Sequence, residues 1–105
     1  MPIETLKRNR EFDKVFNEGK RICGKLLNVL VREVSGKTRM GIIVNRKYGG
    51  AVERNRSRRQ IKEAFRQLVD NFREPKEIVV IPKNGAKNAK TEEIAADLSD
   101  ILARI

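Results

Sequence analysis

Apolar side chains recur at helical spacing in three segments of the chain. Segments 6–19 and 51–72, and the segment from Thr91 to the C-terminus, carry apolar residues three and four positions apart. This spacing predicts amphipathic helices, each with one buried stripe. Asn9 is expected to cap the first helix and Gly19 to end it. The expected buried positions are Phe12, Val15 and Phe16 in the first helix, Ile61, Ala64, Phe65, Leu68 and Val69 in the second, and Ile94, Leu98, Ile101, Leu102 and Ile105 in the third.

Other segments carry strand patterns. Apolar and polar residues alternate over 25–34 and 39–47, which is the two-residue period of a strand with one buried face. The continuous apolar run 77–81 is typical of a strand buried on both faces. Segment 21–23 predicts a small extra strand. A turn signal at 34–37 predicts a hairpin between the two longer strands.

The order of these elements, α-β-β(-β)-α-β-α, indicates the fold class. A strand, the helix 51–72 and a further strand form a βαβ unit, which makes the two strands parallel and the sheet mixed. The expected fold is α+β, a small mixed sheet packed by helices. With 105 residues and no linker or repeat, residues 1–105 are expected to form a single domain.

Positive charge is concentrated on the helix 51–72. The chain has 24 Lys and Arg against 14 Asp and Glu, for a net charge of +10. At about 100° per residue, Asn55, Arg59, Lys62 and Arg66 fall on one side of this helix, away from its apolar stripe. A rigid row of outward cations suits the evenly spaced phosphates of a nucleic acid. The pattern therefore predicts a polyanionic partner.

Residues for independent catalysis are missing. The chain has no histidine and one cysteine, so it offers no Ser/His/Asp set, no Cys/His pair and no internal disulfide. Cys23 is expected to be a small, partly buried filler, while Asp97 and Asp100 are expected to be exposed. With neither an apolar N-terminal segment nor a run long enough to span a bilayer, the protein is expected in the cytoplasm, away from membranes. The pattern favours a binding protein over a self-sufficient enzyme.

Two features have both a structural and a functional interpretation. Gly49 and Gly50 precede the basic helix, where they either present backbone N–H groups to a phosphate or form a plain turn. Phe12 and Phe16, four residues apart, either pack in the core or stack on unpaired bases.

Three stretches together resemble one protein family. They are LKRNREFDKVFNEGKR at 6–21, GIIVNRKYGGAVERNRSRR at 41–59, and RNRSRRQIK at 54–62. In this order they resemble the protein subunit of bacterial ribonuclease P, whose signature is R-N-x-x-K-R-x-x-R. Arg58 stands at the Lys position of that signature and Lys62 at its last Arg position. The resemblance covers nearly the whole chain up to the loop that follows Ile81.

The resemblance implies that residues 1–105 form a single RNA-binding domain, the non-catalytic protein subunit of an endoribonuclease. In this family the RNA subunit removes the 5′ leader from precursor tRNA, using Mg²⁺ held largely by RNA. The implied partners are that catalytic RNA and the single-stranded leader, with no obligate protein partner and no metal site assigned to the protein. The βαβ connection is expected to be left-handed, against the usual rule.

The family's two binding surfaces map onto particular positions of this chain. The RNA-subunit surface comprises Arg54, Asn55, Arg56, Arg58, Arg59, Lys62 and Arg66. The leader cleft, between the sheet and the first helix, comprises Phe12, Phe16, Asn28, Leu30, Asn45, Arg46 and Lys47, with Ile43 beside them.

The chain departs from the family at several positions. Leu30 stands where an aromatic residue is common, and Ile43 where a small polar residue is common. A ribosomal or other structured-RNA-binding protein would share the charge and fold class, and a DNA-binding helix protein is a weaker alternative. The phenylalanine pair and the GGAVERNR junction favour the ribonuclease P interpretation.

Overall fold

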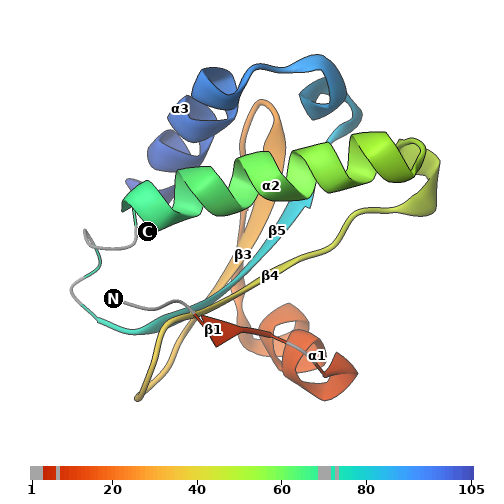
Figure 1. The fold of residues 1–105 in the computed structure, drawn as a ribbon. Helices are drawn as coiled ribbons and strands as arrows, with labels where there is room; N and C mark the ends of the chain where they lie inside the picture. The colour runs from red at the N-terminus through yellow and green to blue at the C-terminus, as the bar shows by residue number, and fades with distance from the viewer. Residues whose placement is uncertain (1–3, 7, 69–71, 73) are drawn as a thin grey trace.

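The computed structural model describes residues 4–6, 8–68, 72 and 74–105. Within these residues the chain forms three α-helices, two 3₁₀ turns and a five-stranded sheet (Figure 1). In chain order the elements are β1 (Glu4–Thr5), α1 (Asn9–Glu18), β2 (Lys20–Cys23), β3 (Leu27–Glu33), β4 (Arg39–Ile42), η1 (Arg46–Tyr48), α2 (Ala51–Leu68), β5 (Lys76–Pro82), η3 (Asn84–Asn88) and α3 (Thr91–Leu102).

The sheet is mixed, and its strand order is β1-β4-β5-β3-β2. β5 lies at the centre, parallel to β4 and antiparallel to β3, and α2 connects β4 to β5. The predicted βαβ unit and α+β fold are therefore confirmed, and the left-handed sense of the connection stays a prediction. The predicted hairpin of β3 with β4 is wrong. The turn at 34–37 reverses the chain, but β5, with its apolar run 78–81, occupies the buried place between the two strands.

The start of the chain also differs from the prediction. β1, which the pattern did not reveal, pairs parallel with β4. Helix α1 begins only at Asn9, so Asn9 is its first residue rather than its cap. Arg8 takes the cap position, with extended backbone and no side-chain hydrogen bond. Gly19 ends the helix as predicted, because a Cβ there would lie 2.4 Å from the carbonyl oxygen of Val15.

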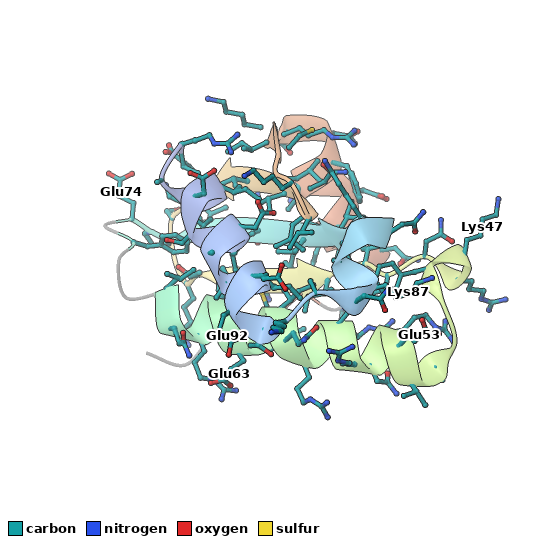
Figure 2. The ribbon with its side chains drawn as sticks, turned by 90° about the horizontal axis from the view of Figure 1, so that it is seen from above. Lys47, Glu53, Glu63, Glu74, Lys87 and Glu92 are labelled. Atoms are coloured by element: carbon teal, nitrogen blue, oxygen red, sulfur yellow. The ribbon has the colours of Figure 1, made fainter. Side chains whose placement is uncertain are left out.

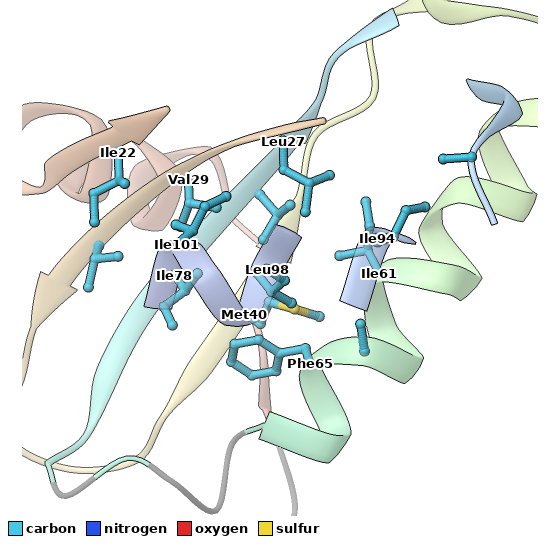
Figure 3. Close-up of a cluster of buried hydrophobic side chains, with 14 residues drawn as sticks. Ile22, Leu27, Val29, Met40, Ile61, Phe65, Ile78, Ile94, Leu98 and Ile101 are labelled. Atoms are coloured by element: carbon cyan, nitrogen blue, oxygen red, sulfur yellow. The ribbon is translucent and has the colours of Figure 1, made fainter. Parts of the chain in front are cut away.

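One face of the sheet carries the main core. Figure 1 shows α2 and α3 together on this side, with α1 on the other. Figure 3 shows the side chains of α2 and α3 meeting those of the strands. Of the predicted stripe on α2, Ile61, Ala64 and Phe65 are buried and Leu68 packs against them, while Val69 lies outside the described residues. The buried residues of this cluster are Ile22, Leu27, Val29, Val31, Met40, Ile61, Ala64, Phe65, Ile78, Val80, Ala89, Ile94, Leu98 and Ile101.

The ends of the second and third helices differ from the prediction as well. Phe72, expected within the second helix, is not helical, yet its ring meets that of Phe65 edge-on at 5.9 Å between centroids. Ile105, expected on the buried stripe of the third helix, lies beyond the end of α3 and is exposed. No helix in the described part of the chain is long and apolar enough to cross a membrane.

A buried carboxylate joins α3 to the sheet. Asp97, expected to be exposed, is only 8% exposed. Its two oxygens accept hydrogen bonds from the backbone N–H groups of Lys25, Leu26 and Leu27, at 2.9–3.0 Å. The correction has a local cause, because the turn between β2 and β3 presents three amides that need an acceptor. Cys23, in contrast, is exposed rather than partly buried, because it lies on the edge strand β2.

Candidate RNA interface

The cationic side of α2 faces away from the core. Of the seven residues predicted to bind an RNA subunit, five are exposed and two are half-buried. The half-buried pair, Arg54 and Arg58, lies on one flank of the helix, where Nη1 of Arg58 donates to Oδ1 of Asn55 at 3.3 Å. We call the exposed five the outer face of α2: Asn55, Arg56, Arg59, Lys62 and Arg66.

The start of α2 is held in place by a buried hydrogen bond. The hydroxyl of Tyr48, in η1, lies 2.7 Å from Oγ of Ser57, and both residues are buried. Nζ of Lys87 lies 5.7 Å from the centroid of the Tyr48 ring, within the range of a cation–π interaction. These contacts fix η1, α2 and η3 relative to one another. Sequence reasoning did not single out Tyr48 or Ser57, whose partnership depends on the turn between them.

The two glycines before α2 do not both present free amides. The N–H of Gly50 donates to Oε1 of Glu53 at 3.3 Å, within the same turn of chain. Gly49 lies so close to the Glu53 carboxyl group that a Cβ would be 2.9 Å from its Cδ. The junction is therefore a tight turn closed by Glu53, and of the two interpretations the structure favours the plain turn.

The side of the sheet that carries α1 has a smaller apolar cluster and an exposed aromatic ring. Val15 is fully buried against Leu30 and Val79, with Phe12 packed at the margin of this cluster. Phe16 is 42% exposed, so it is not a core residue. We define the open sheet face as the group formed by Phe12, Phe16, Asn28, Leu30, Ile43 and Ile81 on this side.

Leu30 contributes less to the open sheet face than the sequence interpretation assumed. It is 6% exposed and lies opposite Val79 in the ladder, beneath α1. Asn28, two residues earlier, is half-buried, and its Oδ1 has no hydrogen-bond partner among the described residues. Of these two predicted cleft residues, only Asn28 therefore has a polar side-chain group, and its Oδ1 is buried without a partner in the described part of the chain.

A row of ion pairs lies along the same side of the sheet. The ladder sets Arg32, Glu77 and Arg39 side by side on three adjacent strands. Arg32 Nη1 lies 2.6 Å from Glu77 Oε1, and Arg39 Nη1 lies 3.7 Å from Glu77 Oε2 and 2.9 Å from Glu11 Oε2 on α1. Glu18, also on α1, lies 3.7 Å from Arg32. This row holds α1 over the sheet, and only the strand register could have revealed it.

The three remaining predicted cleft residues lie elsewhere. Asn45, Arg46 and Lys47 are exposed in and before η1, between the end of β4 and the start of α2. The side chain of Asn45 accepts from the N–H of Lys47 at 3.0 Å, which starts the 3₁₀ turn. Figure 2 shows Lys47 at the margin of the molecule, in the region of Glu53 and Lys87. These three residues therefore lie next to the start of α2, whereas Phe12 and Phe16 lie on α1, on the other side of the sheet.

Among the described residues, no group of three or more His, Cys, Asp or Glu side chains could hold a metal ion. The arrangement offers cations on one side of the sheet, and aromatic and amide groups on the other. Both are suited to binding nucleic acid.

Comparisons with known proteins identify relatives of this chain. Residues 2–105 match the family Ribonuclease P. The ribonuclease P protein component of Shouchella clausii is 32% identical over 96% of this chain and 84% of its own length. The ribonuclease P protein component of Clostridioides difficile is 36% identical over 94% of this chain and 89% of its own length.

Solved structures agree with these matches. The RNase P protein from Thermotoga maritima superposes with a TM-score of 0.86 at 32% identity, covering 97% of each chain. The Staphylococcus aureus protein gives 0.85 at 28% identity, covering 95% of this chain and 93% of its own. With the family match spanning almost every residue and the fold shared with solved members, this chain belongs to the ribonuclease P protein family, whose work is tRNA processing.

Proposed function

We propose that this protein binds the catalytic RNA subunit of ribonuclease P through the outer face of α2. Four cations, Arg56, Arg59, Lys62 and Arg66, are exposed on this surface, and Arg54 and Arg58 flank it. The opposite side of the helix is fixed in the core by Ile61 and Phe65, so the cations keep their spacing. A preorganised row of this kind loses less side-chain entropy on binding phosphates than a flexible tail would.

The open sheet face is proposed to hold the single-stranded 5′ leader of precursor tRNA. Phe16 has a ring partly in solvent, on which an unpaired base can stack. Asn28 adds an acceptor, Oδ1, that is buried without a partner within the described chain, at a residue that is itself half-buried. Asn45, Arg46 and Lys47 extend this path toward α2, where their exposed side chains can contact leader phosphates.

Cleavage itself is assigned to the RNA subunit, with Mg²⁺ held mainly by RNA. The protein's part is to raise the affinity for substrate and to lower the Mg²⁺ concentration that the RNA requires, because its cations neutralise phosphates that Mg²⁺ would otherwise screen. The proposed site of action is the cytoplasm.

The observation that carries this proposal is the placement of two different surfaces on the two sides of one sheet. α2 lies on one side of the sheet and α1 on the other (Figure 1). The cations of α2 are exposed, and so is Phe16 on α1. One rigid domain can therefore contact the catalytic RNA and the leader at the same time.

Reconstitution with a bacterial ribonuclease P RNA tests the proposal. Cleavage of precursor tRNA is measured across Mg²⁺ concentrations with and without the protein. We expect the protein to restore cleavage at a Mg²⁺ concentration where the RNA alone is slow. An identical Mg²⁺ dependence with and without protein, at protein concentrations well above that of the RNA, would contradict it.

A further inference from the structure

A hollow of about 500 Å³ lies between α2 and the beginning of α3. Its walls come from both helices and from the residue before α3, and they include charged and amide side chains. The residues are Arg56, Arg59, Gln60, Glu63, Lys90, Thr91 and Glu92. Only Arg56 and Arg59 belong to the surface already proposed for the RNA subunit, so this hollow extends that surface onto α3.

Gln60 is the buried polar residue of the hollow. It is 6% exposed, and its Nε2 donates to the carbonyl oxygen of Ala89 and lies 3.3 Å from Oγ1 of Thr91. A carbonyl oxygen can only accept, so this contact fixes which end of the amide is the oxygen. Oε1 is left without a hydrogen-bond partner in the described part of the chain. A buried acceptor in this position needs a donor.

The positive groups of the hollow converge from two helices. Arg56 and Arg59 project from α2, and Arg56 Nη1 donates to the carbonyl oxygen of Lys87 at 3.4 Å. α3 is twelve residues long and directs its N-terminus, with its partial positive charge, to the same place. The backbone N–H groups of Glu93 and Ile94 bond to Lys90, whereas those of Thr91 and Glu92 have no partner within the described chain.

Two carboxylates lie at the rim and limit what the hollow can accept. Figure 2 shows Glu63 and Glu92 on the same side of the molecule, with Glu74 well apart from them. Glu63 Oε2 lies 3.6 Å from Nη1 of Arg66, which offsets its charge. Glu92 has no such ion pair among the described residues. A bound anion would therefore be attracted by the arginines and opposed by Glu92.

We propose that the α2–α3 hollow binds one ribonucleotide unit of the RNA backbone, its phosphate against Arg56 and Arg59 and its 2′-hydroxyl donating to Oε1 of Gln60. This inference rests on the proposed function and adds an interaction that depends on ribose rather than on phosphate alone. A hydroxyl group suits an isolated neutral acceptor beside a cationic wall, and deoxyribose lacks it. Arg56 and Arg59 are exposed side chains, so the rim can rearrange to uncover Oε1 as a nucleotide enters.

The test compares wild-type protein with Gln60→Leu, which has similar size but no acceptor. A bacterial ribonuclease P RNA is made with 2′-deoxynucleotides placed at random at low frequency, and bound molecules are separated from free ones. With the wild type, we expect deoxynucleotides to be depleted from the bound pool at particular positions. With Gln60→Leu, depletion should vanish at one position or two adjacent ones and persist elsewhere.

Salt dependence separates the roles of the two kinds of residue. Arg56→Ala should lower the slope of log affinity against log salt by about 0.7–0.9, because one phosphate is no longer neutralised. Gln60→Leu should weaken binding about five-fold with the slope unchanged, because a neutral hydrogen bond releases no counterion. Lys14→Ala is the matched control, since it removes an exposed cation of α1 on the other side of the sheet. It should leave both affinity and slope near the wild-type values.

A second pair of variants tests for an increase in RNA affinity rather than a loss. Glu92→Gln removes the rim carboxylate and should tighten binding two- to three-fold, while Glu74→Gln, remote from the hollow, should not. Melting temperatures confirm that each variant is folded.

Identical depletion patterns for wild type and a folded Gln60→Leu would overturn this inference alone. Failure of the wild-type protein to bind the RNA would overturn the proposed function together with it.

Discussion

Replacement of Phe16 by Ala tests whether the open sheet face binds the leader. Truncating a fully buried Phe costs about 3–5 kcal/mol of stability. Phe16 is 42% exposed at the last turns of α1, so only about half of that cost applies. Alanine also favours the helix by about 0.5 kcal/mol. The free energy of unfolding should therefore fall by about 1–2 kcal/mol, which leaves the domain folded.

The expected loss of leader affinity is of similar size but has a different signature. Stacking of one base on an aromatic ring contributes about 1–3 kcal/mol. Since Leu30 is buried and aliphatic, no second ring flanks Phe16 at that position, and we expect the lower half of the range. This corresponds to a loss of about five- to thirty-fold. The loss should appear only for leaders long enough to reach α1.

The assay measures equilibrium binding of the assembled holoenzyme to precursor tRNA with leaders of increasing length, and to mature tRNA. Val15→Ala is the matched control, because Val15 is fully buried in the same helix and cannot touch RNA. It should lower stability by about 2 kcal/mol without any dependence on leader length. The stacking argument is wrong if Phe16→Ala weakens binding of mature tRNA as much as binding of precursor tRNA. It is also wrong if Phe16→Ala, like Val15→Ala, lowers stability without any dependence of binding on leader length.

Three further predictions follow from other features. A folded triple variant, Arg54→Ala with Arg58→Ala and Arg59→Ala, should bind the catalytic RNA more weakly. The slope of log affinity against log salt should fall by about 0.7–0.9 for each phosphate that is no longer neutralised. An unchanged slope would contradict the proposed surface. Protein stripped of RNA should leave precursor tRNA intact in the presence of Mg²⁺, and specific 5′ cleavage that persists after RNA removal would refute this. Asp97→Ala should lower the free energy of unfolding in urea by about 3–5 kcal/mol, because three backbone amides lose a charged acceptor. Asp100→Ala, which breaks only an exposed pair with Arg104, should cost less than about 1 kcal/mol, and equal losses for the two would refute the difference.

Local patterns were enough to predict most elements of this fold. The apolar stripes of α2 and α3 and the continuous run of β5 are strong periodic signals, and the structure buries Ile61, Phe65, Leu98 and Ile101 as they require. Strand pairing was not predictable in the same way. A turn between β3 and β4 is equally compatible with direct pairing and with a third strand placed between them. Only long-range packing determines which of the two arrangements forms.

The candidate site divides along the same line. The outward position of Arg59 and Lys62 follows from helical geometry alone, and the structure confirms it, because both side chains are exposed. The ion-pair row through Glu77, the Tyr48–Ser57 hydrogen bond and the burial of Gln60 join residues that are remote in sequence or depend on a turn. No periodicity encodes such contacts, because each requires the register of elements that the pattern leaves free.

The central position of β5 also constrains the order in which the chain can fold during synthesis. β5 spans Lys76–Pro82 and supplies the ladder partner for both β3 and β4. Until these residues leave the ribosome, β3 and β4 each lack a neighbour, and α2 has only part of the apolar surface it covers. The domain therefore cannot complete its sheet before roughly three quarters of the chain has emerged. Nascent chains ending before Lys76 should be the species most prone to aggregation and most in need of a chaperone.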